Sequence, residues 1–216
     1  MGFLDWMSYN AGRVGELTLA HLWMTLTPTF IGLLLALPVG WFAYRHRRAY
    51  PWIVGIGGLL YTLPSLAVFI ILPMVVGTRI LDPLNVVIAL SVYTFALLVR
   101  SVADGLASVS PETNQAAEAM GMNGLQRFFR VQLPVATPVI LASMRVIVVT
   151  NVSIVSMAAI IGVPQLGSLF TEGFSRRQTI PIIVGIGVCL LLAIVLDQLI
   201  VRTSKILTPW LPKERA

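Results

Sequence analysis

Long apolar runs separated by short polar segments dominate this chain. Five runs are each roughly 20 residues long or more, which at ~1.5 Å per residue is enough for a helix to cross a lipid bilayer. They occupy residues 22–44, 51–76, 84–106, 135–161 and 180–201. Trp23 and Trp41 lie near the two ends of the first run, where spanning helices carry interfacial aromatic residues. The pattern predicts an all-α integral membrane protein with about five transmembrane helices.

The segment before the first run also has a helical pattern. Its apolar residues recur three or four positions apart, at Leu4, Met7, Ala11, Val14 and Leu17. Residues 1–21 are therefore expected to form either an interfacial helix or a lead-in to the first span, and both alternatives stay open. Residues 22–206 are expected to form one transmembrane domain, followed by a polar cytoplasmic tail over residues 207–216.

Residues 107–134 form the one long polar interruption. Ser110 suits a helix N-cap, and Pro111 suits the first helical position after it. Gly121 suits the left-handed conformation that ends a helix, and Asn123 can cap a second one. We expect two short helices joined by a tight bend, with the second ending at Leu133 and Pro134.

Composition supports a membrane location and excludes a soluble basic protein. Hydrophobic residues make up 57% of the chain and charged residues only 11%, against about 25% charged residues in soluble domains. The formal charge is +6, but the basic residues lie in short loops between apolar runs. That is the distribution of the positive-inside rule, so no nucleic-acid partner is expected.

The loop charges also predict an orientation. With five spans, one side of the membrane carries more Lys and Arg than the other. The richer side has Arg45, Arg47, Arg48, Arg127, Arg130, Arg202, Lys205, Lys213 and Arg215, and the poorer side has Arg13, Arg79, Arg176 and Arg177. The N-terminus is therefore expected outside, and the 107–134 segment and the C-terminus inside.

The polar segment resembles the EAA loop of bacterial ABC importer permeases. That family's pattern is EAA, three residues, G, nine residues, and then I, one residue and LP. The matching positions here are Gln115, Ala116, Ala117, Gly121, Val131, Leu133 and Pro134. The spacing agrees throughout, while Gln115 stands where the family has Glu.

Further stretches resemble the osmoprotectant branch of these permeases. Residues 61–67 read YTLPSLA, similar to the branch's TIPSLA stretch, and residues 131–140 read VQLPVATPVI. Residues 158–167, AAIIGVPQLG, are similar to its AxIGxGGLG stretch, except that Val163, Pro164 and Gln165 replace small and glycine residues. The resemblance covers about residues 59–200 and implies import of glycine betaine, choline, carnitine or proline.

The resemblance implies a type I importer fold, a division of labour and a set of partners. Two permease subunits, identical or related, would pair in the cytoplasmic membrane of a bacterium. Each would dock on an ATPase subunit that holds ATP and Mg, and an extracytoplasmic binding protein would deliver the solute. The ATPase-coupling residues would be Gln115, Ala116, Ala117, Glu118, Met120, Gly121, Met122, Leu133 and Pro134.

The residues themselves fit a non-enzymatic subunit. The sequence contains no G-x-x-x-x-G-K-[ST] loop for nucleotide phosphates. Cys189 is the only cysteine, and His21 and His46 have no metal-ligand neighbours in sequence. No catalytic site, bound cofactor or metal is therefore expected in this chain.

Ionisable residues inside the apolar runs are costly in lipid, so each suggests a role. Arg100 and Asp104 are spaced to pair on one helix, and Arg145 and Asp197 can pair between helices. Structural ion pairing and a role along the substrate path both stay open for these four residues. Polar and aromatic residues that can line a path are Tyr61, Ser65, Tyr93 and Asn151.

Three other functions would each require different sequence features. A methionine or amino-acid importer permease would have similar length and five spans, but the TLPSLA stretch disfavours it. A channel would need no EAA-like loop and would work without ATP. A membrane enzyme would need a cluster of catalytic groups at one depth, which the sequence does not contain.

Overall fold

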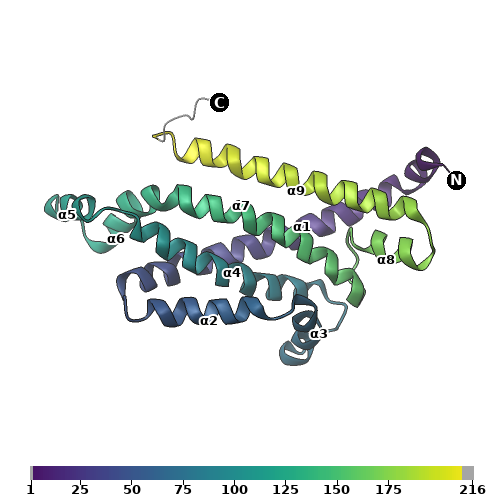
Figure 1. The fold of residues 1–216 in the computed structure, drawn as a ribbon, viewed down its shortest axis with the longest axis horizontal. Helices are drawn as coiled ribbons and strands as arrows, with labels where there is room; N and C mark the ends of the chain where they lie inside the picture. The colour runs from purple at the N-terminus through teal and green to yellow at the C-terminus, as the bar shows by residue number, and fades with distance from the viewer. Residues whose placement is uncertain (1, 211–216) are drawn as a thin grey trace.

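The chain folds into a bundle of helices. The computed structural model describes residues 2–210, and this part contains no β-strand. The elements are α1 (Phe3–Arg45), α2 (Tyr50–Thr62), α3 (Ser65–Val76), α4 (Pro83–Ala107), α5 (Pro111–Ala119), α6 (Gly124–Arg127), a π-helix (Phe128–Gln132), α7 (Leu133–Met157), a 3₁₀-helix (Ala158–Ile161), α8 (Ser168–Ser175) and α9 (Thr179–Leu207). Helices α1, α4, α7 and α9 run along the long axis (Figure 1). The predicted all-α class is confirmed.

The second predicted span is broken. Helices α2 and α3 meet at 100°, so four helices can cross a membrane by length and composition, or five if this bent pair counts as one span. The run predicted as the second span, residues 51–76, therefore forms two helices joined at a sharp bend. Leu63 and Pro64 both adopt extended backbone angles. Proline disfavours helical angles in the residue before it and has no N–H to continue the helical ladder.

The segment expected over residues 1–21 is the first part of α1, which continues into the first span without interruption. The later part of its apolar stripe packs inside the protein, whereas Leu4 and Ala11 are exposed. Val14 and Leu17 are buried in a cluster with Leu166, Leu169 and Val184, from the region of α8 and α9. This first part of α1 is therefore held in place, through Val14 and Leu17, by contacts with the α8 and α9 region. Most of the tail predicted over residues 207–216 lies outside the described residues.

Helix α4 is the centre of the bundle. In its apolar stretch 67% of the residues are buried, against 28–33% in the other three spanning helices. Two of the core clusters contain its side chains, one toward each end of the helix, with Val86 and Leu90 in the first and Leu98 and Val102 in the second. Helices α1, α2, α3 and α7 all contact α4.

Small residues bring α1 close to α4. Gly32, Ala36 and Gly40 recur every four residues and are buried on one face of α1. A Cβ atom added to Gly32 would lie 2.5 Å from Thr94 Cγ2, and one added to Gly40 would lie 2.6 Å from Val102 Cγ1. Because small residues let helix backbones approach closely in lipid, this stripe sets the distance between the two helices.

Candidate functional site

The predicted coupling loop occupies one end of the bundle, where α5 and α6 project beyond the long helices (Figure 1). Helix α5 begins as the sequence predicts. The backbone N–H of Thr113 donates to Ser110 Oγ at 3.2 Å, and Pro111 is the first helical residue. Hydrogen bonds from the backbone N–H of Glu112 and from Ser110 hold the pKa of the Glu112 carboxylate below its ordinary value.

The bend between α5 and α6 is built by backbone geometry. Gly121 has a φ of 78°, and its N–H donates to Glu118 O at 2.9 Å. The N–H of Met122 donates to Ala117 O at 3.1 Å. These two bonds form a Schellman motif, which requires a left-handed residue at the glycine position. Met120 is 68% exposed, and a Cβ atom at Gly121 would meet no atom within 4 Å, so the bend is an open surface.

The two short helices are tied to each other. Asn123 caps α6 and forms a reciprocal capping box with Gln126. Arg127 on α6 forms an ion pair with Glu118 on α5. Deeper in the loop, the Gln132 amide donates to Asn114 Oδ1 at 2.8 Å. The bend is therefore held by side chains from both sides.

The loop packs against the end of α1 that is predicted to face the cytoplasm. The ring of Phe128 lies 5.3 Å from that of Trp41, and the Arg45 guanidinium lies 5.8 Å from the Trp41 ring centroid. Arg45 also reaches the start of α6, where a Cβ atom added to Gly124 would lie 2.9 Å from it. A displacement of the bend would therefore press directly on α1.

The second short helix does not stop at the membrane. It continues through the π-helix into α7, so the prediction that Leu133 and Pro134 end it is wrong. The N–H of Leu133 donates to Phe128 O, one residue further back than in an α-helix. This wider turn places Pro134, which has no N–H to donate, in the first turn of α7, where proline is tolerated.

The remaining predicted positions in the loop differ in exposure. Gln115, Ala116 and Glu118 are exposed, whereas Ala117 is buried. Farther along the loop, Leu125 and Phe129 are exposed, whereas Phe128 and Gln132 are buried.

The candidate pathway residues fall into two groups. Tyr61 and Tyr93 meet edge to face with ring centroids 6.0 Å apart, and the Tyr93 hydroxyl donates to Leu63 O at 3.0 Å beside the α2–α3 break. Ser65 begins α3 just after that break. Asn151 is buried elsewhere, and its amide donates to hydroxyls of Thr29 and Thr94 at 3.1 and 3.0 Å. Asn151 therefore cross-links α1, α4 and α7.

The two ion pairs suggested by the sequence are present. Arg145 on α7 binds Asp197 on α9 through two hydrogen bonds of 2.7 and 2.9 Å. Arg100 and Asp104 lie 3.5 Å apart on α4, and the Tyr50 hydroxyl also donates to Asp104 at 2.6 Å. The first pair joins two helices. The second lies within α4, and the Tyr50 hydrogen bond connects it to the start of α2.

Removing one partner of the α7–α9 pair is expected to lower the amount of folded protein several-fold. Asp197→Asn leaves the Arg145 charge without its partner in an apolar environment, where an unpaired charge is costly. The double variant Arg145→Leu with Asp197→Leu removes both charges and should recover most of the loss. Detergent-extracted, monodisperse protein per cell measures the effect. Equal yields for the single and double variants would show that the pair is not structural.

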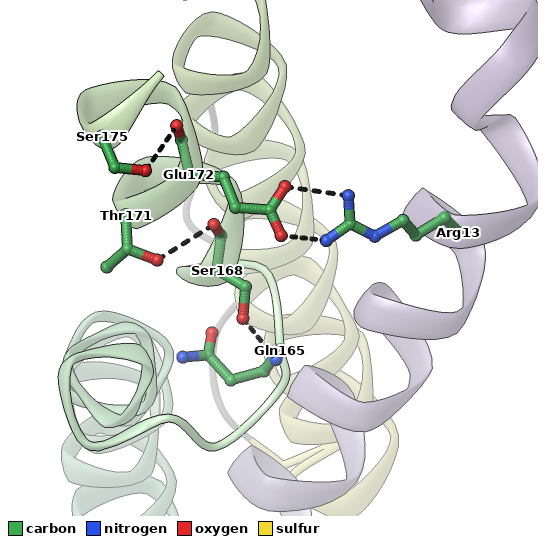
Figure 2. Close-up of polar contacts among 6 residues, drawn as sticks. All are labelled: Arg13, Gln165, Ser168, Thr171, Glu172 and Ser175. Carbon is green, nitrogen blue, oxygen red and sulfur yellow. Dashed lines mark hydrogen bonds and ion pairs between the residues drawn. The ribbon is translucent and has the colours of Figure 1, made fainter. Parts of the chain in front are cut away.

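A second polar cluster lies at the opposite end of the bundle. Glu172 on α8 points to Arg13 on α1, and the two side chains make a two-pronged ion pair (Figure 2). Below it, Gln165 is fully buried, with its amide oxygen 3.1 Å from His21 Nδ1 and its amide nitrogen donating to Ser156 O at 3.1 Å. These contacts fasten α1 to the connection before α9. We call them the α1–α8 clasp.

The clasp is expected to weaken in acid. The Arg13 hydrogen bond holds the pKa of the Glu172 carboxylate below its ordinary value. The stabilisation is therefore complete above the ordinary carboxyl pKa and is lost as the pH falls through the lowered value. Glu172→Gln should lower the thermal unfolding temperature at pH 7 and much less at pH 3. Glu16→Gln, an exposed change on α1, the helix that carries Arg13, is the control. An equal effect of Glu172→Gln at both pH values would contradict this role.

Comparison with known proteins identifies the family. The sequence matches the binding-protein-dependent transport system inner membrane component over residues 29–205. The chain belongs to this family. It is 34% identical to the osmoprotectant import permease protein OsmW of Salmonella typhimurium, over 97% of this chain and 98% of that protein. It is 27% identical to the choline transport system permease protein OpuBB of Bacillus subtilis, over 95% and 94%.

Solved structures agree with the fold. The permease chain resembles a chain of the inward-facing MetNI methionine ABC transporter with a TM-score of 0.74, at 20% identity over 93% of this chain and 96% of that one. The protein is therefore a multi-pass inner membrane permease subunit of an ABC importer, a family whose ATPase resides in a partner.

Proposed function

We propose that this permease moves a compatible solute, glycine betaine or a related quaternary ammonium compound or proline, across the cytoplasmic membrane by alternating access. The observation that carries the proposal is the open Schellman bend at Gly121, in EAA-loop spacing, in a chain that matches an osmoprotectant import permease over nearly its whole length. The bend supplies an ATPase contact, and the relatives supply the substrate class.

The proposed coupling runs from the bend into the membrane. An ATPase groove would receive Met120, Gly121 and Met122, and the ATPase would hold ATP and Mg. ATP can drive a conformational change only by favouring one of two states. The bend must therefore transmit the conformation of the ATPase to the membrane helices. The contacts of Trp41 and Phe128 and the continuous helix from α6 to α7 provide that path.

The proposed assembly has two ATPase subunits, a second permease and an extracytoplasmic binding protein, with the N-terminus outside and the C-terminus inside. The coupling loop, the α1–α2 connection and the end of α9 then share the cytoplasmic side, as the loop charges predict. Lys213 and Arg215, which entered that charge argument, lie outside the described residues.

The proposed pathway passes the α2–α3 break. Tyr61 and Tyr93 present aromatic rings beside an interrupted helix, and aromatic faces attract quaternary ammonium groups. Ser65 adds a hydroxyl at the same break. Asn151 is assigned to helix packing, because its amide hydrogens are already donated to two threonines.

Two alternatives make different predictions. A methionine-type permease has a similar fold at 20% sequence identity. That resemblance carries no information about the substrate. An ATP-independent channel would carry solute without the ATPase. Uptake of labelled glycine betaine at high osmolarity, in cells with and without this chain, tests the first alternative, and dependence of that uptake on ATP hydrolysis tests the second. Uptake that depends on the chain supports the proposal. Unchanged glycine betaine uptake with lost methionine uptake contradicts the assigned substrate class.

A further inference from the structure

A pocket of about 560 Å³ opens at the end of the bundle that carries the coupling loop. Its walls come from three places: the α1–α2 connection, the last turns of α4 and the first turn of α5. The polar and aromatic part of its lining is Tyr44, Arg47, Tyr50, Asp104 and Asn114. The pocket does not include the bend at Gly121 or the tyrosine pair at the α2–α3 break.

The lining carries opposite charges and aromatic rings. Arg47 is exposed and makes no ion pair with any residue in the described part of the chain. Its guanidinium is suited to bind a carboxylate with two parallel hydrogen bonds. Asp104 accepts a hydrogen bond from the Tyr50 hydroxyl at 2.6 Å and also lies 3.5 Å from Arg100, which offsets part of its charge. Together with the rings of Tyr44 and Tyr50, it offers a negative, aromatic surface of the kind that attracts an alkylammonium group.

We propose that this pocket binds a zwitterionic ammonium carboxylate from the cytoplasm and that binding slows import. The proposal rests on the substrate class and the orientation proposed above. Imported solute accumulates on the cytoplasmic side, so a weak site there fills only after import has succeeded. The pocket would therefore act as a feedback site for the transported class of solute.

The position of the pocket explains how a bound solute would act. A ligand held between Arg47, Asp104 and Asn114 joins the α1–α2 connection, α4 and α5. A ligand shifts a conformational equilibrium toward the state that it binds better. The bound zwitterion thus favours the arrangement in which α5 lies against the end of the bundle, and it opposes the movement of the coupling loop that transport needs.

The test uses the complete importer in liposomes, with glycine betaine trapped inside at increasing concentration. The initial rate of ATP-driven uptake is expressed relative to empty liposomes of the same variant. We expect the rate of the unchanged importer to fall as the internal concentration rises. Arg47→Gln should raise the half-inhibiting concentration about tenfold, the effect of losing a charge-assisted hydrogen bond. Arg48→Gln, an exposed neighbour outside the pocket lining, should leave it unchanged.

Two chemical controls test the zwitterion itself. Trapped choline, which lacks the carboxylate, should inhibit more weakly than glycine betaine, and trapped acetate should not inhibit. Inhibition that is absent, or equal in the Arg47→Gln and unchanged importers, overturns the proposal. Equal inhibition by choline also overturns it, because Arg47 would then have no carboxylate to bind.

A binding measurement keeps this test separate from the proposed function. If the importer takes up no glycine betaine into liposomes that hold no trapped solute, the substrate proposal fails. Equilibrium binding of labelled glycine betaine to the purified importer, without the binding protein, then examines the pocket through the comparison of Arg47→Gln with Arg48→Gln. Binding that Arg47→Gln weakens and Arg48→Gln spares supports the pocket. Absent binding, or binding insensitive to Arg47→Gln, overturns it.

Discussion

Replacing Gly121 with valine is expected to abolish transport while leaving the membrane bundle assembled. Gly121 has a φ of 78°, and an L-residue in this left-handed region costs ~1–2 kcal/mol, more for a β-branched side chain. The two hydrogen bonds of the Schellman motif depend on that geometry. Valine would therefore unfold the bend or change its shape, and movement of the ATPase would no longer be transmitted through it.

The expected readout is uncoupling. The assembled importer should keep ATP hydrolysis and lose at least ~90% of uptake, as one lost ~1.4 kcal/mol interaction already reduces an equilibrium tenfold. Gly121→Asn is the matched control, because asparagine tolerates the left-handed region. It should retain far more uptake than valine. Gly121→Asp tests charge at the same point. If the valine and aspartate variants both transport normally, Gly121 is not at the ATPase contact.

The second large effect is expected at the α1–α4 contact. A Cβ atom at Gly32 would lie 2.5 Å from Thr94 Cγ2 and 2.9 Å from the backbone nitrogen of Phe95. The backbone of α4 cannot yield without moving the central helix, so Gly32→Val should destabilise the fold by about 3 kcal/mol or more. Gly32→Ala should have a smaller effect in the same direction.

The matched control lies on the same helix. A Cβ atom at Gly15 would meet nothing within 4 Å, so Gly15→Ala should be neutral or stabilising, as alanine favours helix over glycine by ~0.5–1 kcal/mol. Thermal unfolding of the purified chain, followed by circular dichroism, measures all three variants. Equal melting temperatures for Gly32→Val and Gly15→Ala would contradict the close-packing account.

The sequence predicted local features well because their causes are local. The N-cap at Ser110, the left-handed Gly121 and the cap at Asn123 each depend on a few neighbouring residues. The same signals cannot tell which proline breaks a helix. Pro28 and Pro38 lie inside α1, whereas Pro64 separates α2 from α3. That outcome depends on whether neighbouring helices satisfy the freed carbonyl groups.

The α1–α8 clasp shows the limit of sequence reasoning at a distance. Arg13 and Glu172 are separated by 159 positions, and nothing in the local pattern joins them. The sequence did contain one sign of a buried polar contact: Gln165 stands where the related stretch has a small residue. The structure gives the reason, because Gln165 fills a buried position against His21. A polar residue in an otherwise small-residue stretch therefore indicated a partner, but not which one.

The most direct test of the central claim is solute uptake by the complete importer in liposomes, with its ATPase and binding protein. We predict that glycine betaine enters with ATP, that it does not enter with a non-hydrolysable ATP analogue, and that Gly121→Val abolishes entry while ATP hydrolysis continues. Entry that needs no ATP hydrolysis, or that Gly121→Val leaves unchanged, would contradict an importer driven through this loop.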